Sequence, residues 1–288
     1  MLMLTVIGEL LLDAFLDTIK LVPFLFLTYL AMEYIEHHTG TKTQQIVSRA
    51  GRFGPAIGGV VGIVPQCGFS AAAANLYAGR VITVGTLLAV FLSTSDEMLP
   101  IFLSHSVEGM VIVKILLIKA VLAVCIGMGV DAVMRIKRKG DDGLRIVDFC
   151  QHEHCHCEQS IVKSAIRHTI KIALYIFVIS AALNMLLNFI GEDTLGQVLA
   201  GQKILAVFMS ALVGLIPNCA ASVVITELYL EGVLGTGAML AGLLVGSGTG
   251  LLVLLRVNKH RIQNAKIIVT LYAAGVVCGI IAECIGIA

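Results

Sequence analysis

The sequence contains little charge and no tryptophan. Of its 288 residues, 14% are charged and 58% are apolar, and the mean hydropathy is +0.94. A soluble domain of this length cannot hide so much apolar surface in one core, so the composition predicts helices that span a bilayer. Because tryptophan is missing, the membrane boundaries must be inferred from charged residues.

Several functional classes are also disfavoured by what is missing. The formal net charge of +1 gives no reason to expect a nucleic-acid partner. There is no Walker motif for direct use of ATP, and Cys67 has no histidine within the membrane segments of its half to form a catalytic pair, so we do not expect an enzyme. Residues 1–17 contain no Lys or Arg, and we expect them to lead into the first span rather than form a cleaved signal peptide.

A gapless internal duplication covers residues 61–92 and 213–244. Twelve of the 32 aligned positions are identical at an offset of 152. The identical pairs include Pro65/Pro217, Cys67/Cys219, Ser70/Ser222, Tyr77/Tyr229 and Gly85/Gly237. A composition rich in apolar residues does not explain why these five residue types recur at the same offset. Such duplication is typical of secondary transporters.

The duplication predicts an all-α polytopic fold of two repeats joined by a linker. We expect residues 1–134 to form the first repeat, 135–160 a polar linker and 161–288 the second repeat. Each repeat would contain three long helices and a helical hairpin broken at its proline, about ten membrane segments when hairpin arms are counted separately. The expected long helices are 10–35, 81–103, 111–134, 161–190, 233–257 and 267–287, and the hairpins are 53–79 and 203–230.

The distribution of Lys and Arg along the chain predicts the orientation of the protein in a cytoplasmic membrane. They are concentrated in loop 39–52, at Arg80, around the linker and in loop 258–266, which we expect to be cytoplasmic, while both termini are expected outside. Each hairpin would then enter and leave on one side, because an arm of about a dozen residues spans only about 20 Å. The two repeats would have opposite orientations, and their proline-containing tips would meet near the midplane.

The hairpin tips are the first candidate substrate site. They pair the amides of Gln66 and Asn218, the thiols of Cys67 and Cys219, and the hydroxyls of Ser70 and Ser222. A helix that begins at such a tip offers free N–H groups to an anion, while carbonyls and side chains can bind a cation. The alternative is that proline and glycine only break the helices and the amides cap them.

A polar stretch interrupts the helix expected at 81–103. It reads Ser-Thr-Ser-Asp-Glu and includes Ser95, Asp96 and Glu97, and its counterpart at 246–250 is glycine-rich and contains Ser247. Adjacent carboxylates within a span are costly and mark ion or proton pathways, so we expect both helices to unwind here. The alternative places Asp96 and Glu97 at the outer interface.

A third group contains candidates for coupling. Asn75 and Glu227 are equivalent in the duplication, as are Lys20 and Lys171 on the first helices. Together with Asp96, the residues Glu227, Lys20 and Lys171 are the coupling candidates. The alternative for the lysines is that they extend to the lipid headgroups.

The linker contains a dense group of metal-binding side chains. Thiolates and imidazoles at this density bind Zn²⁺, Cu⁺ or Ni²⁺, although the spacing is not that of a zinc finger. We expect a cytoplasmic metal-capturing loop, with a polar linker of accidental metal affinity as the alternative. The candidate ligands are Cys150, His152, His154, Cys155, His156 and Cys157.

The nine residues from Gly62 to Ser70 (GIVPQCGFS), with Gly85 and the Ser-Thr-Ser-Asp-Glu stretch, resemble the ten-span heavy-metal exporter family, which is related to the arsenical permeases. Its members are labelled arsenic efflux proteins or manganese transporters. The resemblance covers nearly the whole chain and implies export of a metal or metalloid.

The sequence therefore favours a secondary exporter of manganese, another divalent ion or an arsenical, acting between the hairpin tips. Its expected partners are the lipid bilayer and the metal or metalloid substrate. No tightly bound cofactor is expected, only a transported or loop-bound metal ion. The oligomeric state is left open, with a homodimer as one option. Two alternatives stay open: a transporter of a small organic anion or metabolite, and a membrane metal sensor.

Overall fold

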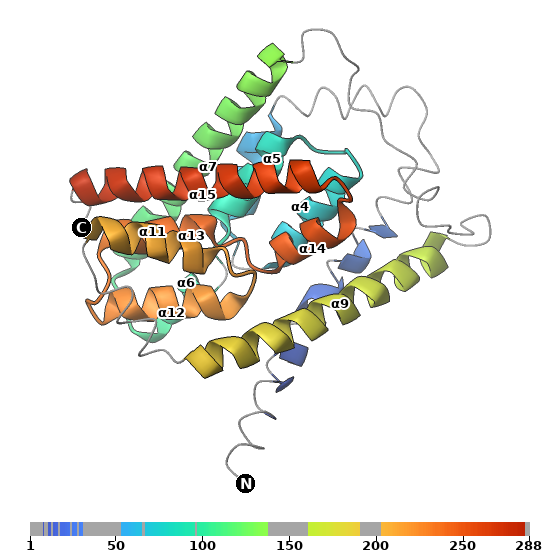
Figure 1. The fold of residues 1–288 in the computed structure, drawn as a ribbon, viewed down its shortest axis with the longest axis horizontal. Helices are drawn as coiled ribbons and strands as arrows, with labels where there is room; N and C mark the ends of the chain where they lie inside the picture. The colour runs from blue at the N-terminus through green and yellow to red at the C-terminus, as the bar shows by residue number, and fades with distance from the viewer. Residues whose placement is uncertain are drawn as a thin grey trace.

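The computed structural model describes residues 8, 11–12, 14–16, 18–23, 25–27, 29–30, 53–64, 67–95, 97–137, 161–190 and 203–285. Every regular element in these ranges is a helix (Figure 1). Besides helical residues between 8 and 30, they are α3 (Gly54–Val61), α4 (Cys67–Ala78), α5 (Val84–Ser93), α6 (Met98–Ser104), α7 (Gly109–Lys137), α9 (Ile161–Ile190), α11 (Lys203–Gly214), α12 (Cys219–Leu230), α13 (Thr236–Val245), α14 (Thr249–Val257) and α15 (Arg261–Ile285).

Five helical stretches in the described ranges are long and apolar enough to cross a membrane. They are Val84–Ser104, Gly109–Met134, Ala165–Leu183, Thr236–Val257 and Arg261–Ile285. The stretch through α13 and α14 is 89% buried, whereas the one on α7 is 28% buried. On α7 the exposed side chains include Val113, Leu117 and Val121. Such an apolar outer surface suits contact with lipid, so α13 and α14 lie at the centre of the fold and α7 at its edge.

Two of these stretches are broken in the middle, as the sequence predicts. The first ends as α5 at Ser93 and resumes as α6 at Met98, and the second ends as α13 at Val245 and resumes as α14 at Thr249. The second break depends on glycine, because Gly248 has φ +53° and ψ −142°, a conformation that side chains with a Cβ rarely adopt. Both breaks leave helix ends in the interior of the protein.

The two halves of the chain repeat the same helices and contacts. Helix α12 begins and ends 152 residues after α4, and α13 does so relative to α5. Helix α5 packs against α7, and α13 packs against α15. At matching points, Gly85 N donates to Asp131 Oδ1 over 2.9 Å, and Gly237 N donates to Glu283 Oε2 over 3.0 Å. Each carboxylate thereby fixes the first turn of a neighbouring helix.

The halves interlock through their broken elements. Helix α4 packs against α14, and α12 packs against α6. The second arm of each hairpin therefore contacts the segment that follows the break in the other half's broken helix. At the second of these contacts the rings of Phe102 and Tyr229 lie 6.2 Å apart. Each half therefore completes the packing of the other around the two breaks.

The N-terminal helical residues pack against α9. Phe15 meets Phe177 edge to face with centroids 6.2 Å apart, and Tyr29 stacks on His168 at 5.5 Å. Phe15 precedes Tyr29 in the chain, whereas its partner Phe177 follows His168, so the two helices run antiparallel. In Figure 1 these residues, in blue, lie beside α9 at the periphery of the molecule.

Removing the buried carboxylate of Asp131 should destabilise the protein. Asp131 Oδ2 also accepts the half-buried Thr83 hydroxyl over 2.6 Å, so Asp131→Ala leaves the buried Gly85 N–H without this acceptor and removes one of the partners of Thr83. We expect a loss of about 2–3 kcal/mol in the free energy of unfolding and a much smaller loss for Asp131→Asn, which keeps an acceptor. Thermal unfolding in detergent measures the difference. Equal effects of the two substitutions would contradict this account.

Candidate functional site

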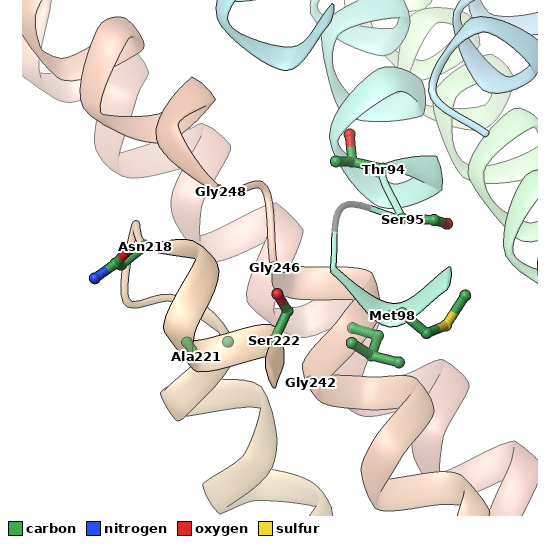
Figure 2. Close-up of a pocket in the computed structure, with 11 residues that line it drawn as sticks. Thr94, Ser95, Met98, Asn218, Ala221, Ser222, Gly242, Gly246 and Gly248 are labelled. Carbon is green, nitrogen blue, oxygen red and sulfur yellow. The ribbon is translucent and has the colours of Figure 1, made fainter. Parts of the chain in front are cut away.

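A small cavity lies where the two helix breaks meet the start of α12. The break between α5 and α6 contributes Thr94 and Ser95, and the break between α13 and α14 contributes Gly246 and Gly248. The full lining is Thr94, Ser95, Met98, Gly214, Asn218, Ala221, Ser222, Gly242, Leu243, Gly246 and Gly248. Figure 2 shows Thr94, Ser95 and Met98 on one side of the stretch through Gly246 and Gly248, and Asn218, Ala221 and Ser222 on the other.

The hydroxyl groups around the cavity donate to nearby carbonyls. Thr94 Oγ1 donates to Val90 O over 2.7 Å, and Ser222 Oγ donates to Cys219 O over 2.7 Å. Ser95 Oγ donates to Ser93 O over 3.1 Å. A hydroxyl whose proton is used in this way keeps its oxygen lone pairs for another partner. The cavity wall can therefore offer oxygen ligands to a cation or accept hydrogen bonds from a hydroxylated solute.

Non-helical backbone adds further polar groups. Thr94 follows the last residue of α5, and Gly246 follows the last residue of α13. The carbonyls at such C-terminal ends carry partial negative charge. Broken helices with exposed ends are the usual way in which transporters build ion and substrate sites inside the membrane.

The cavity is present at the second hairpin because matched positions differ in size. At the first hairpin, Gly250 lets α14 approach α4 so closely that an added Cβ would lie 2.7 Å from the Ser70 Cβ. The residue equivalent to Gly250 is Met98, and the residue equivalent to Phe69 is Ala221. Both Met98 and Ala221 line the cavity. The larger Met98 prevents an equally close approach of α6 to α12, and the small Ala221 leaves space.

Three of the predicted substrate-site residues come together here. Ser95, Asn218 and Ser222 line the cavity, although in Figure 2 the Asn218 amide points away from Thr94 and Ser95. The other described candidates, Cys67, Ser70, Cys219, Ser247 and Glu97, are not among the lining residues. Cys219 is buried on the same helix as Ser222, and Glu97 is half-buried just before α6.

The serines predicted as substrate ligands also have a local structural role. Ser70 Oγ donates to Cys67 O over 2.8 Å, matching the bond from Ser222 to Cys219 in the second half. Each of these bonds closes the first turn of the arm that follows a hairpin tip. Only in the second half does the serine also face the cavity.

The predicted coupling group is spread over different environments. Lys20 and Lys171 have exposed side chains and Glu227 is half-buried, which favours the alternative in which the lysines extend toward the membrane surface. Asn75 is fully buried and accepts a hydrogen bond from Tyr29 over 2.9 Å. The equivalence of Asn75 and Glu227 in sequence is therefore not an equivalence in environment.

Several candidates lie outside the described residues. They are Gln66, Asp96 and the linker residues Cys150, His152, His154, Cys155, His156 and Cys157. Among the residues that the structure does describe, no group of three or more His, Cys, Asp and Glu side chains is placed to hold a metal ion.

Lys119 is the residue near the cavity that the sequence analysis missed. It lies within α7, is 1% exposed, and its Nζ donates to Thr94 O over 2.5 Å. A lysine nine positions into the helix expected at 111–134 was itself a signal, because charge inside a span is costly and tends to be functional. Met98 gave no such signal, because it is one of many apolar residues in its span.

Comparison with curated proteins and with solved structures finds no match. A family model described as "Putative, 10TM heavy-metal exporter" matches residues 3–199, which include the first hairpin, the first broken helix, the linker and α9. The long apolar helices, the shorter helices between them and this match agree with the resemblance found in the sequence. The chain is therefore a multi-pass membrane protein that belongs to the ten-transmembrane heavy-metal exporter family.

Proposed function

We propose that the chain is a secondary exporter of a metal ion or metalloid and that the cavity at the second hairpin is its substrate site. The observation that carries this proposal is the position of the cavity, between two helix breaks and a hairpin arm. Membership of a heavy-metal exporter family supports the substrate class. A membrane protein needs a reason to keep unwound backbone in its centre, and a polar cavity provides one.

A hard divalent ion such as Mn²⁺ is the substrate that this site suits better. The described lining offers hydroxyl and backbone groups, and Ser95 precedes the carboxylates of Asp96 and Glu97 in the chain. Oxygen ligands suit Mn²⁺, whereas arsenite prefers thiolates. Cys219 is buried close by on α12 and keeps the arsenical as the competing substrate.

The two halves are proposed to be inverted repeats. Three features support a common origin of the two halves: the matched helices, the matched carboxylate contacts, and the packing of each hairpin arm against the other half's broken helix. Opposite orientation follows from the distribution of Lys and Arg along the chain. In such transporters one half rocks against the other around a fixed central site, which gives alternating access.

The proposed orientation predicts which loops are accessible from each side of the membrane. Loops 39–52 and 258–266, Arg80 and residues 137–160 should face the cytoplasm, and both termini should face outside. Single cysteines introduced into a background without native cysteines, treated with a membrane-impermeant thiol reagent, report the accessible side. Glu108→Cys, between α6 and α7, should be labelled from outside, and Lys259→Cys should be labelled only after permeabilisation. Strong external labelling of Lys139→Cys would contradict the assignment.

A panel of metals tests the proposed function in cells. Cells with and without the chain are challenged with Mn²⁺, other divalent ions and arsenicals, and their element content is measured by mass spectrometry. An exporter lowers the cellular content of its substrate. Deleting residues 150–158 separates the metal-sensor alternative, because an exporter keeps residual transport without its loop whereas a sensor loses its response. Unchanged contents across the panel would favour the organic-anion alternative.

A further inference from the structure

The ammonium group of Lys119 is buried near the middle of the membrane. Lys119 lies ten residues after the start of α7 at Gly109, about 15 Å along the helix axis, which is half of the roughly 30 Å hydrocarbon thickness. Only 1% of the residue is exposed. A charge at this depth is expensive, so its retention calls for a specific role.

The fold as such does not require a lysine at this position. The equivalent residue in the second half is Leu271, which is fully buried in α15. The helices that pack most extensively on α7 are α3 and α5, and neither contains a titratable side chain. The matching position of the second half is thus buried without a charge.

One partner of Lys119 is the type of group that binds cations in transporters. Lys119 Nζ donates to Thr94 O over 2.5 Å, and Thr94 follows the last residue of α5. Carbonyls at a helix C-terminus carry partial negative charge, and those at broken helices bind the transported or coupling cation. Thr94 also lines the cavity, so the ammonium and a cation in the cavity would share one carbonyl.

We propose that the carbonyl end of α5 at Thr94 is a cation site, and that the Lys119 ammonium is a tethered cation that fills it whenever no metal ion is bound. This inference rests on the proposed export function. A divalent ion entering the cavity displaces the ammonium, because two cations repel one another strongly in a poorly solvated site. The four-carbon stem of lysine lets the ammonium withdraw and return. Its return after release keeps the empty site neutralised while the transporter resets.

Three variants separate charge from hydrogen bonding. Lys119→Met removes the charge and keeps most of the stem, whereas Lys119→Gln keeps a donor for Thr94 without the charge. The control is Lys114→Met, which removes an exposed lysine from the same helix. All are made in a chain whose possible loop ligands are replaced by serine, so that only the membrane site binds metal: Cys150, His152, His154, Cys155, His156 and Cys157.

Binding of Mn²⁺ to the purified protein is the first measurement. Without a competing cation, Lys119→Met and Lys119→Gln should each bind Mn²⁺ about tenfold more tightly or better, and Lys114→Met should bind like the parent. Misfolding does not produce tighter binding, so the result is informative even if the variants are less stable. Arsenite, which is uncharged near neutral pH, should show no such gain.

Transport in proteoliposomes is the second measurement. Exchange of Mn²⁺ inside for labelled Mn²⁺ outside needs only the loaded transporter, so it should persist in both Lys119 variants. Net efflux into metal-free buffer requires the empty transporter to return, and it should fall at least about tenfold. A residue that only caps α5 would reduce exchange and net efflux together.

The outcomes distinguish the two proposals. If Lys119→Gln behaves like the parent in affinity and in net efflux, the hydrogen bond rather than the charge matters, and the tethered-cation proposal is wrong while export stands. Weaker Mn²⁺ binding by Lys119→Met would also overturn it. If the parent protein moves neither Mn²⁺, nor the other divalent ions of the panel, nor arsenite, the proposed function itself fails.

Discussion

Replacing Asp96 with asparagine should lower Mn²⁺ export about a hundredfold, because a divalent ion in the membrane interior then lacks a charge partner worth roughly 2–3 kcal/mol. Asp96 is the neighbour of Ser95, which is 2% exposed and lines the cavity. Adjacent carboxylates in an apolar span are the most expensive feature of the sequence. Export is measured as Mn²⁺ efflux from cells that express equal amounts of each variant.

Two cysteine variants are the comparison for this experiment. Cys67→Ser and Cys219→Ser should be mild for Mn²⁺, because a hard ion gains little from sulfur. For a thiophilic metalloid the order is inverted: both cysteine variants should abolish protection, and Asp96→Asn should matter less. The ranking therefore distinguishes oxygen from sulfur chemistry. Wild-type export by all three variants would show that the site lies elsewhere.

Filling the cavity should abolish export of any substrate. Ala221 lines the cavity, and its equivalent in the first half is Phe69. Ala221→Phe gives the second hairpin the side chain that the first already has, and its ring occupies the space beside Ser222. We expect export to fall at least about a hundredfold, with the protein still inserted in the membrane.

The adjacent residue provides a matched control. Ala220 is also on α12, is partly exposed and does not line the cavity. Ala220→Phe adds the same ring to the same helix and should leave export within a few-fold of the parent. If the two variants lose export equally, the cavity is not the substrate site and a general effect on α12 explains both. Fluorescence-detected size-exclusion chromatography confirms that both are folded.

The architecture was largely predictable because its signals are local. Pro65, Pro217 and the glycine-rich stretch at 246–250 mark breaks wherever they occur in an apolar helix. The equal offsets of α4 and α12 and of α5 and α13 follow from the duplication. Family membership also follows from contiguous residues, chiefly those around Cys67.

The cavity was only partly predictable because it depends on contacts between distant residues. The sequence identifies Ser70 and Ser222 as equivalents, but it does not show that Ser70 meets Gly250 while Ser222 lies with Met98 in the wall of a cavity. The sequence likewise shows a lysine at 119 without showing its partner, Thr94, 25 residues earlier. Periodicity predicts which side chains share a helix face but not which helix covers them.

The buried pair of Tyr29 and Asn75 illustrates the same limit. Asn75 is equivalent to Glu227 in the duplication, yet it accepts a hydrogen bond from the Tyr29 hydroxyl, and Tyr29 in turn stacks on His168 of α9. These three residues come from three separate helices. Their association is a consequence of how the N-terminal helix and α9 pack beside α4, which no local pattern determines.

Transport by everted membrane vesicles tests the central claim most directly, because the cytoplasmic face is then outside and export appears as uptake. Vesicles that contain the chain should accumulate Mn²⁺ several-fold faster than vesicles without it, those with Ala220→Phe should match the parent, and those with Ala221→Phe should match the empty vesicles. The account would be contradicted if vesicles with and without the chain took up Mn²⁺, the other divalent ions of the panel and arsenite at the same rates.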